Sequence, residues 1–221
     1  MNRTTWAALA AACVFASGLS QADPLNNNPG LPGMDRPAAN ISPVFHQLVV
    51  FTLPAHFKAV YEKTNGSFYI REHVPEGEND DHWTRMITLT ATRDLAANPN
   101  VSPRAFIETI AASFRRHCPD SYASTALGRQ TLGGNEGFAV VASCGRVLAG
   151  SESHSETAVM LAFKGSADYY TIQWAERGAV SARPLTLDSA YWTKRIAQLA
   201  PVRLCPIVPG EPAPYVSCVG Q

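Results

Sequence analysis

The first 22 residues predict that this chain folds in an oxidising compartment. A charged start at Arg3 is followed by an apolar run over residues 6–16. The small residues Ser20 and Ala22 then form a typical cleavage site. The apolar run is too short to span a bilayer, so the pattern indicates a secretory signal peptide that is cleaved after Ala22. We therefore expect a secreted, periplasmic protein.

Cleavage would leave four cysteines, an even number in a compartment where disulfides persist. They are Cys118, Cys144, Cys205 and Cys218. Four cysteines allow three pairings. Cys118 extends the apolar row of a predicted helix, and Cys144 lies on the apolar face of a predicted strand, so the two can meet in a core. We expect Cys118–Cys144 and Cys205–Cys218 bonds. A redox or metal role is disfavoured because no Cys-x-x-Cys motif is present.

A second interpretation of the N-terminus concerns Cys13. The run Leu9-Ala10-Ala11-Ala12-Cys13 resembles a lipobox, in which the cysteine would become the lipidated first residue. However, Ala10 stands where a lipobox favours leucine, and apolar residues continue past Cys13. These features favour the cleaved signal peptide over the lipoprotein.

The composition indicates one domain of ordinary size. Cleavage of 22 from 221 residues leaves 199, which is enough for one substantial core. Without Arg3, 17 basic residues face 18 acidic residues, and the formal charge is minus one. No basic block is present, so charge gives no basis for binding nucleic acid or an anionic membrane. No further apolar run approaches about 18 residues, and we expect no transmembrane segment in the mature chain.

Apolar periodicity predicts several strands, a helix, more strands and a second helix. The expected strands cover residues 47–53, 57–62, 68–74, 83–92, 124–131, 138–147, 155–163 and 169–175. Asn65-Gly66 favours a hairpin turn, and the glycine-rich run 133–137 favours another turn over a phosphate loop. Ser102-Pro103 opens a helix that should end near His117. A second helix is expected over residues 188–199.

This order of elements predicts an α+β fold. We expect an antiparallel sheet covered by two main helices, a disulfide-stapled arrangement like an α/β/α sandwich, over residues 44–200. Residues 23–43 are rich in Asn, Pro and Gly and predict a flexible tether. Residues 201–221 contain four prolines between Cys205 and Cys218 and begin with a fifth, Pro201, so we expect a wrapped tail without regular structure.

The densest group of ionisable side chains lies in residues 72–83, with His73, His82 and five carboxylates. Such a group could bind a divalent cation or carry out acid–base chemistry. The candidate binding residues are Glu76, Asp80, Asp81, His82 and Trp83. A solvated acidic loop is the alternative, because the EF-hand spacing and the His-Glu-x-x-His pattern are both absent. Trp83 also fits a core anchor. No Gly-x-Ser-x-Gly elbow is present, and we predict no catalytic residue, metal or cofactor.

One stretch of the sequence carries a family resemblance. The run Glu72-x-Val74-Pro75-x-Gly77-Glu78, followed by Trp83-Thr84-x-Met86-Ile87, resembles a segment of small exported bacterial proteins. With the order of strands and helices, residues 45–199 resemble the PsbP-like and DcrB-like group of α/β/α sandwiches. That resemblance implies a non-enzymatic accessory or binding protein. The Pro-rich, cysteine-closed tail departs from the family pattern.

Three functional hypotheses follow. The first is a periplasmic accessory or binding protein that presents a surface to another envelope protein. The second is a small metal-dependent enzyme that uses His73, His82 and the carboxylates of residues 72–83. The third is a purely structural envelope protein. The sequence favours the first over the second, because no catalytic motif is present, and it does not separate the first from the third.

Overall fold

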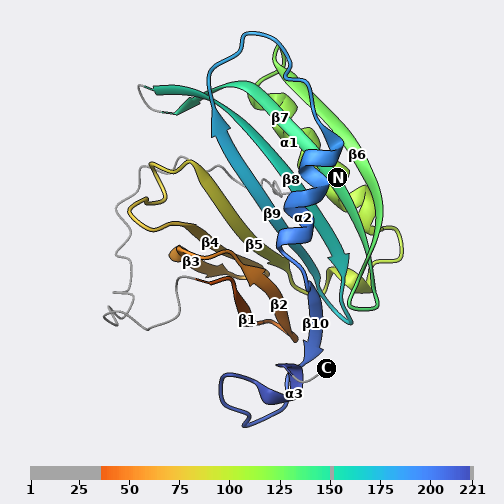
Figure 1. The fold of residues 1–221 in the computed structure, drawn as a ribbon. Coiled ribbons are helices and arrows are strands. Elements are labelled where there is room, and N and C mark those ends of the chain that lie inside the picture. The colour runs from red at the N-terminus through yellow and green to blue at the C-terminus, as the bar shows by residue number, and fades with distance from the viewer. Residues whose placement is uncertain (1–35, 150–151, 220–221) are drawn as a thin grey trace.

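The computed structural model describes residues 36–149 and 152–219. The predicted signal peptide, the Cys13 motif and residues 23–35 of the predicted tether lie outside these residues. Figure 1 shows the described chain as two sheets with a few helices. Among the described residues, no helix combines the length and the apolar character needed to cross a membrane.

Seven strands form the larger sheet, in the order β3-β4-β5-β9-β8-β7-β6, with every neighbouring pair antiparallel. Their bounds are β3 Phe57–Asn65, β4 Phe68–Pro75, β5 Arg85–Thr92, β6 Tyr122–Leu132, β7 Asn135–Ala149, β8 Glu152–Lys164 and β9 Tyr169–Gly178. The predicted hairpin at Asn65-Gly66 joins β3 to β4, and Gly66 takes the left-handed φ of 60° that the turn requires. The predicted turn at Gly133-Gly134 joins β6 to β7.

Three strands form a smaller sheet, in the order β1-β2-β10. Their bounds are β1 Ala38–Val44, β2 Gln47–Leu53 and β10 Arg203–Pro206. The central strand β2 is buried on both sides. Val49 and Phe51 face the larger sheet, whereas Leu48 and Val50 pack against the two cysteines of the tail. This double burial explains the continuous apolar run of β2.

The described chain has four helices, and the two main ones begin where the sequence predicts. They are the short η1 Leu95–Ala97, α1 Pro103–His117, α2 Ser189–Gln198 and α3 Val216–Val219. The Ser102 hydroxyl accepts the Ala105 N–H at 3.2 Å at the start of α1. Asp188 caps α2 in the same way through the N–H of Ala190 at 2.9 Å. Both main helices predicted from periodicity are confirmed.

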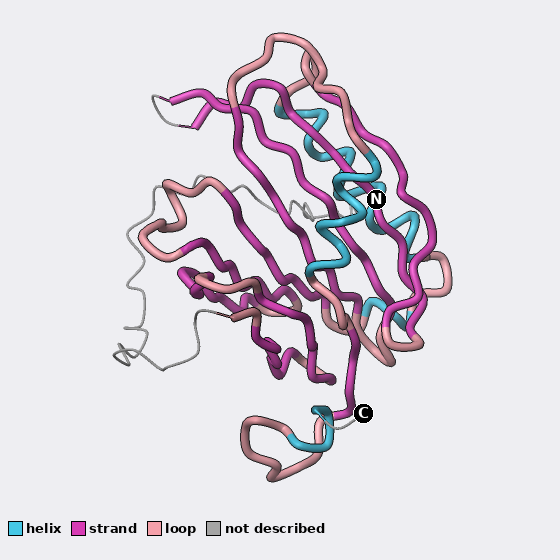
Figure 2. The backbone as a smooth tube through the Cα atoms, viewed as in Figure 1, coloured by secondary structure: helices cyan, strands magenta, loops and turns pink. Residues whose placement is uncertain are grey.

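The predicted helix-covered sandwich is wrong, because the protein is mostly β-structure (Figure 2). α1 covers one face of the larger sheet, over β6, β7 and β8. The opposite face is covered by the smaller sheet together with α2. α2 has ten residues and spans only about 15 Å, so it covers only part of that face. The remaining apolar surface is buried by β1 and β2. The sequence predicted residues 38–43 as part of the tether and residues 47–53 as a strand of the single sheet.

Two segments expected to lack regular structure contain strands. Residues 38–44 fall at the end of the predicted tether but form β1, which pairs with β2 along its whole length. Residues 203–206 fall in the predicted tail but form β10, which pairs with the other edge of β2. Pro43 and Pro206 are tolerated because β1 and β10 are edge strands. In both segments, pairing with β2 overrides the local composition.

Both predicted disulfides are confirmed. Cys118 follows α1 and bonds Cys144 on β7, with 5.6 Å between the Cα atoms. Cys205 on β10 bonds Cys218 in α3, with 5.8 Å between the Cα atoms. The first bond ties α1 to the larger sheet, and the second closes the tail over the outer face of the smaller sheet. All four of these cysteines are buried.

Candidate functional site

The loop between β4 and β5, residues 76–82, is held by its own side chains, and we name it the acidic loop. Asn79 Oδ1 accepts two main-chain N–H groups further along the loop, at 2.8 and 3.0 Å. The Glu78 carboxylate accepts the N–H and the hydroxyl of Thr84, each at 2.7 Å. These bonds fix the backbone of a loop for which the sequence predicted no fixed geometry.

Trp83 and Arg177 anchor the end of the acidic loop. The Trp83 side chain is buried in the core on the α1 side of the sheet, which confirms the alternative interpretation of this residue as an anchor. The guanidinium carbon of Arg177, on β9, lies 3.8 Å from the Trp83 ring centroid. Arg177 Nη1 also donates to the Asp81 carbonyl at 2.9 Å. A cation–π contact and a charge-assisted bond therefore hold the loop against β9.

The remaining candidate residues point into solvent. Glu76, Asp80, Asp81 and His82 are all exposed. Glu76 lies 3.5 Å from His56 Nδ1 in an exposed ion pair. Within the described part of the chain, the side chains of Asp80, Asp81 and His82 make no hydrogen bond or ion pair. The structure therefore places these carboxylates on a loop whose backbone is held by hydrogen bonds and leaves them open to solvent.

Glu72 lies beneath the acidic loop on β4, with limited exposure. Burial, together with the negative charges of Asp80 and Glu156, raises the pKa of Glu72 to about 7. His73 follows Glu72 in the chain but faces the smaller sheet, because neighbouring residues of a strand point to opposite faces. The two histidines of residues 72–83 are thus not brought together.

Replacing Glu72 with glutamine is expected to stabilise the protein above about pH 7. The folded-state pKa of Glu72 exceeds its ordinary value of 4.5, so wild-type stability falls as the pH rises from 4.5 to 7. Glutamine removes that loss. The free energy of unfolding of the variant should exceed that of the wild type by about 1 to 3 kcal/mol at alkaline pH and by almost nothing near pH 4. Urea unfolding across this range measures the difference. An equal effect at every pH would contradict the assigned cause.

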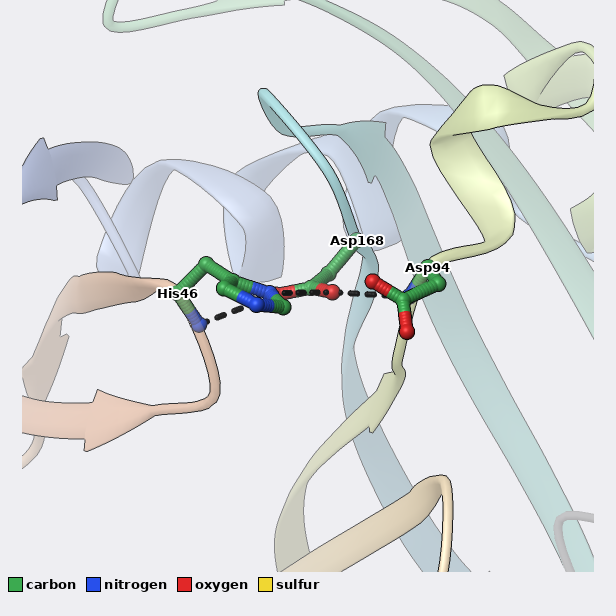
Figure 3. Close-up of side chains that lie close together, drawn as sticks. All are labelled: His46, Asp94 and Asp168. Carbon is green, nitrogen blue, oxygen red and sulfur yellow. Dashed lines mark hydrogen bonds and ion pairs between the residues drawn. The ribbon is translucent and has the colours of Figure 1, made fainter.

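A second cluster, shown in Figure 3, joins His46, Asp94 and Asp168. His46 lies in the β1–β2 turn, Asp94 precedes η1, and Asp168 lies in the β8–β9 turn. Asp168 is fully buried, whereas the other two residues are exposed. Figure 3 shows the three side chains converging from separate parts of the fold.

The Asp168 carboxylate accepts several hydrogen bonds from main-chain and side-chain groups. It accepts the N–H of Asp94 at 2.9 Å, the N–H of His46 at 3.1 Å and the hydroxyl of Tyr170 at 2.9 Å. His46 Nδ1 lies 3.0 Å from both carboxylate oxygens. Burial alone would raise the pKa of Asp168, but these hydrogen bonds outweigh it and hold the pKa below its ordinary value.

The cluster also has the composition of a cation site. One ligand atom from each of His46, Asp94 and Asp168 lies within 4.8 Å of the other two, and first-row divalent ions accept such nitrogen and oxygen donors. The hydrogen bonds nevertheless account for both oxygens of Asp168 without an ion. We therefore assign the cluster as a structural joint between three segments. Within the described ranges, no set of this kind is found in the acidic loop.

Sequence reasoning missed this joint because its members are far apart in the chain and belong to no motif. Asp168 bonds residues 122 and 74 positions away. A weak signal existed, since each residue is a polar residue beside a turn between apolar strands. Nothing in the sequence pairs the three turns, because their meeting depends on how the smaller sheet lies on the larger one.

The comparisons with known proteins give a loose structural likeness and no family. No protein-family model and no curated protein matches the sequence. The crystal structure of LpqN, involved in cell envelope biogenesis of Mycobacterium tuberculosis, superposes with a TM-score of 0.39 at 11% identity. The match covers 82% of this chain and 88% of that chain. A superposition this loose establishes no shared fold, and membership of the PsbP-like and DcrB-like group is not confirmed.

Proposed function

We propose that the protein is an exported, non-enzymatic accessory protein of the periplasm that presents the acidic loop to a basic segment of another envelope protein. Two disulfides fit a protein that folds outside the cytoplasm. The observation that carries the proposal is the contrast within the loop. Several hydrogen bonds hold its backbone, while Asp80, Asp81 and His82 have exposed side chains that bond nothing within the described residues.

This contrast favours recognition of a charged partner. A rigid loop loses little conformational entropy on binding, so its carboxylates are available for new ion pairs at low cost. A local concentration of negative charge also steers a basic partner toward the loop, although the whole chain is close to neutral. Glu72 places a further titratable carboxyl group beneath the loop, and its charge changes near neutral pH.

Reversing the charge of the loop is expected to abolish partner capture. In the variant Asp80→Lys with Asp81→Lys, crosslinking in intact cells should recover the bound envelope protein at least about tenfold less than wild type, because two attractive charges become repulsive. Neither side chain makes a bond in the described structure, so the circular dichroism spectrum and the melting temperature should stay unchanged.

Asp120→Lys provides the matched control, since Asp120 is an exposed acid that follows α1. It should leave partner capture at the wild-type level. Capture that is equal in wild type and in the double variant would remove the acidic loop from the function. Capture that is insensitive to about 0.5 M salt would also contradict an electrostatic interface, because exposed charge pairs are screened at that ionic strength.

The alternative of a metal-dependent enzyme has no supporting geometry in the loop. His73 is buried between the two sheets, while His82 is exposed at the tip, so they cannot act on one ion. Metal content of the purified protein remains a direct test of this alternative. A stoichiometric ion retained after purification would favour it over the accessory function.

A further inference from the structure

One histidine is buried in the contact between the two sheets. His73, on β4, is 1% exposed, and its ring meets the ring of Phe51 on β2 edge to face, with 6.0 Å between centroids. Nδ1 lies 3.4 Å from the Ile87 carbonyl of β5. Nε2 is buried without a hydrogen-bond partner among the described residues. A buried polar atom of this kind is costly, and it becomes far more costly if it carries a proton and a charge.

The charges around His73 oppose its protonation. Arg71 lies on the same face of β4, and its guanidinium donates to the Ser42 hydroxyl of β1 at 3.3 Å. The same guanidinium lies 3.7 Å from Glu62 of β3. β2 contributes the apolar Phe51 ring, and β5 contributes only a neutral carbonyl. The charge that acts on His73 is therefore that of a cation, Arg71, which would repel a protonated His73 in the core.

We propose that the contact of His73 with Phe51 is an acid-sensitive joint, which opens when His73 takes up a proton and releases the smaller sheet locally from the larger one. The joint lies on the side of the smaller sheet where β1 and β2 meet β4 and β5. A periplasmic protein would experience acid directly, so such a joint couples the exposure of this surface to the pH of the surroundings.

The pH range of this opening follows from linkage. Burial and the charge of Arg71, opposed by the hydrogen bond to the Ile87 carbonyl, lower the pKa of His73 from 6.5 to about 4. The joint keeps its full stability above pH 6.5 and loses it as the pH falls from 6.5 to 4. Two other groups act elsewhere. Protonation of Glu72, on the opposite face of the larger sheet, stabilises the folded protein as the pH falls. The pKa of Asp168 lies below its ordinary value.

Hydrogen exchange of backbone amides, measured by mass spectrometry and corrected for intrinsic rates, tests the proposal. Between about pH 7 and about pH 4.5, amides of β1 and β2 should lose protection on the order of 50-fold. Amides of β7 and β8, two inner strands of the larger sheet that lie under α1, should change little. His73→Phe keeps a ring without a charge and should abolish the loss in β1 and β2.

Controls separate this joint from general acid sensitivity. His117→Phe removes an exposed histidine at the end of α1 and should behave as wild type. His73→Gln gives a second uncharged variant if the phenylalanine variant does not fold. The proposal is overturned if β2 and β7 lose protection together in the wild type, or if either folded His73 variant still loses protection in β2.

Discussion

Replacing Asp168 with asparagine is expected to lower the free energy of unfolding by about 3 to 5 kcal/mol. The carboxylate is buried and accepts hydrogen bonds from His46, Asp94 and Tyr170. Asparagine has nearly the same size, but its NH₂ group would face donors and leave at least one buried N–H or O–H unpaired. The melting temperature should fall by roughly 10 °C in a domain of this size.

Asp94→Asn is the matched control for that variant. Only the main-chain N–H of Asp94 bonds Asp168, and asparagine tolerates the left-handed φ of 59° at this position as well as aspartate does. We expect a change below about 0.5 kcal/mol. Urea unfolding of both variants decides the point. A large loss of stability in Asp94→Asn, or stabilisation of the wild-type protein by an added divalent ion, would show that the cluster binds a cation instead of acting as a structural joint.

Removing the disulfide between α1 and β7 is the second change with a large expected effect. In the variant Cys118→Ala with Cys144→Ala, the free energy of unfolding should fall by about 3 to 5 kcal/mol. The bond closes a loop of 26 residues, and its sulfur atoms are buried, so the variant loses both the constraint on the unfolded chain and contacts in the core. Reduction of the wild-type protein breaks both disulfides and should give a larger loss.

The second disulfide provides the comparison. Its loop is shorter, with a sequence separation of 13, and it closes the tail over the outer face of the smaller sheet. Cys205→Ala with Cys218→Ala should therefore cost less overall, about 2 to 3 kcal/mol in the chain-entropy model. It should raise exchange in the tail and β10 before the larger sheet is affected. An equal and global loss in both variants would contradict the separate roles assigned to the two bonds.

Local signals in the sequence were sufficient for most of the larger sheet. The Ser102 cap, the Asn65-Gly66 turn and the alternation of β8 and β9 each act within a few residues, and the structure confirms all of them. The disulfide pairing also followed from local faces, because Cys118 and Cys144 both point toward the layer between α1 and the sheet. These features depend on residue spacings within short segments, which can be recognised in a single sequence.

The smaller sheet depended on contacts that no local signal encodes. The apolar pattern of β2 is the same whether it joins the large sheet or a separate one. β1 and β10 carry prolines and have little strand character of their own, so both appear only because β2 offers two free edges. The error in fold class follows from this, since a second sheet occupies the space that the sequence assigned to helices.

The candidate site divides in the same way. The acidic side chains of residues 76–82 are visible in the sequence, and their exposure follows from their charge. The rigidity of the loop depends partly on Arg177, almost one hundred residues further along the chain, and could not be predicted. The joint at Asp168 and the burial of His73 depend entirely on how the two sheets pack.

The composition of the smaller sheet has a consequence for the order of events during export. Its central strand lies near the start of the described chain, while β10 lies near the end, after every strand of the larger sheet. A chain that crosses a membrane from its N-terminus delivers β1 and β2 long before residues 203–206 arrive. Until then β2 has an unpaired edge and an uncovered outer face, which is the kind of surface that aggregates or recruits chaperones. In the export that we propose, completion of the smaller sheet, sealed by Cys205 and Cys218, therefore has to await residues 203–206, after the strands of the larger sheet have emerged.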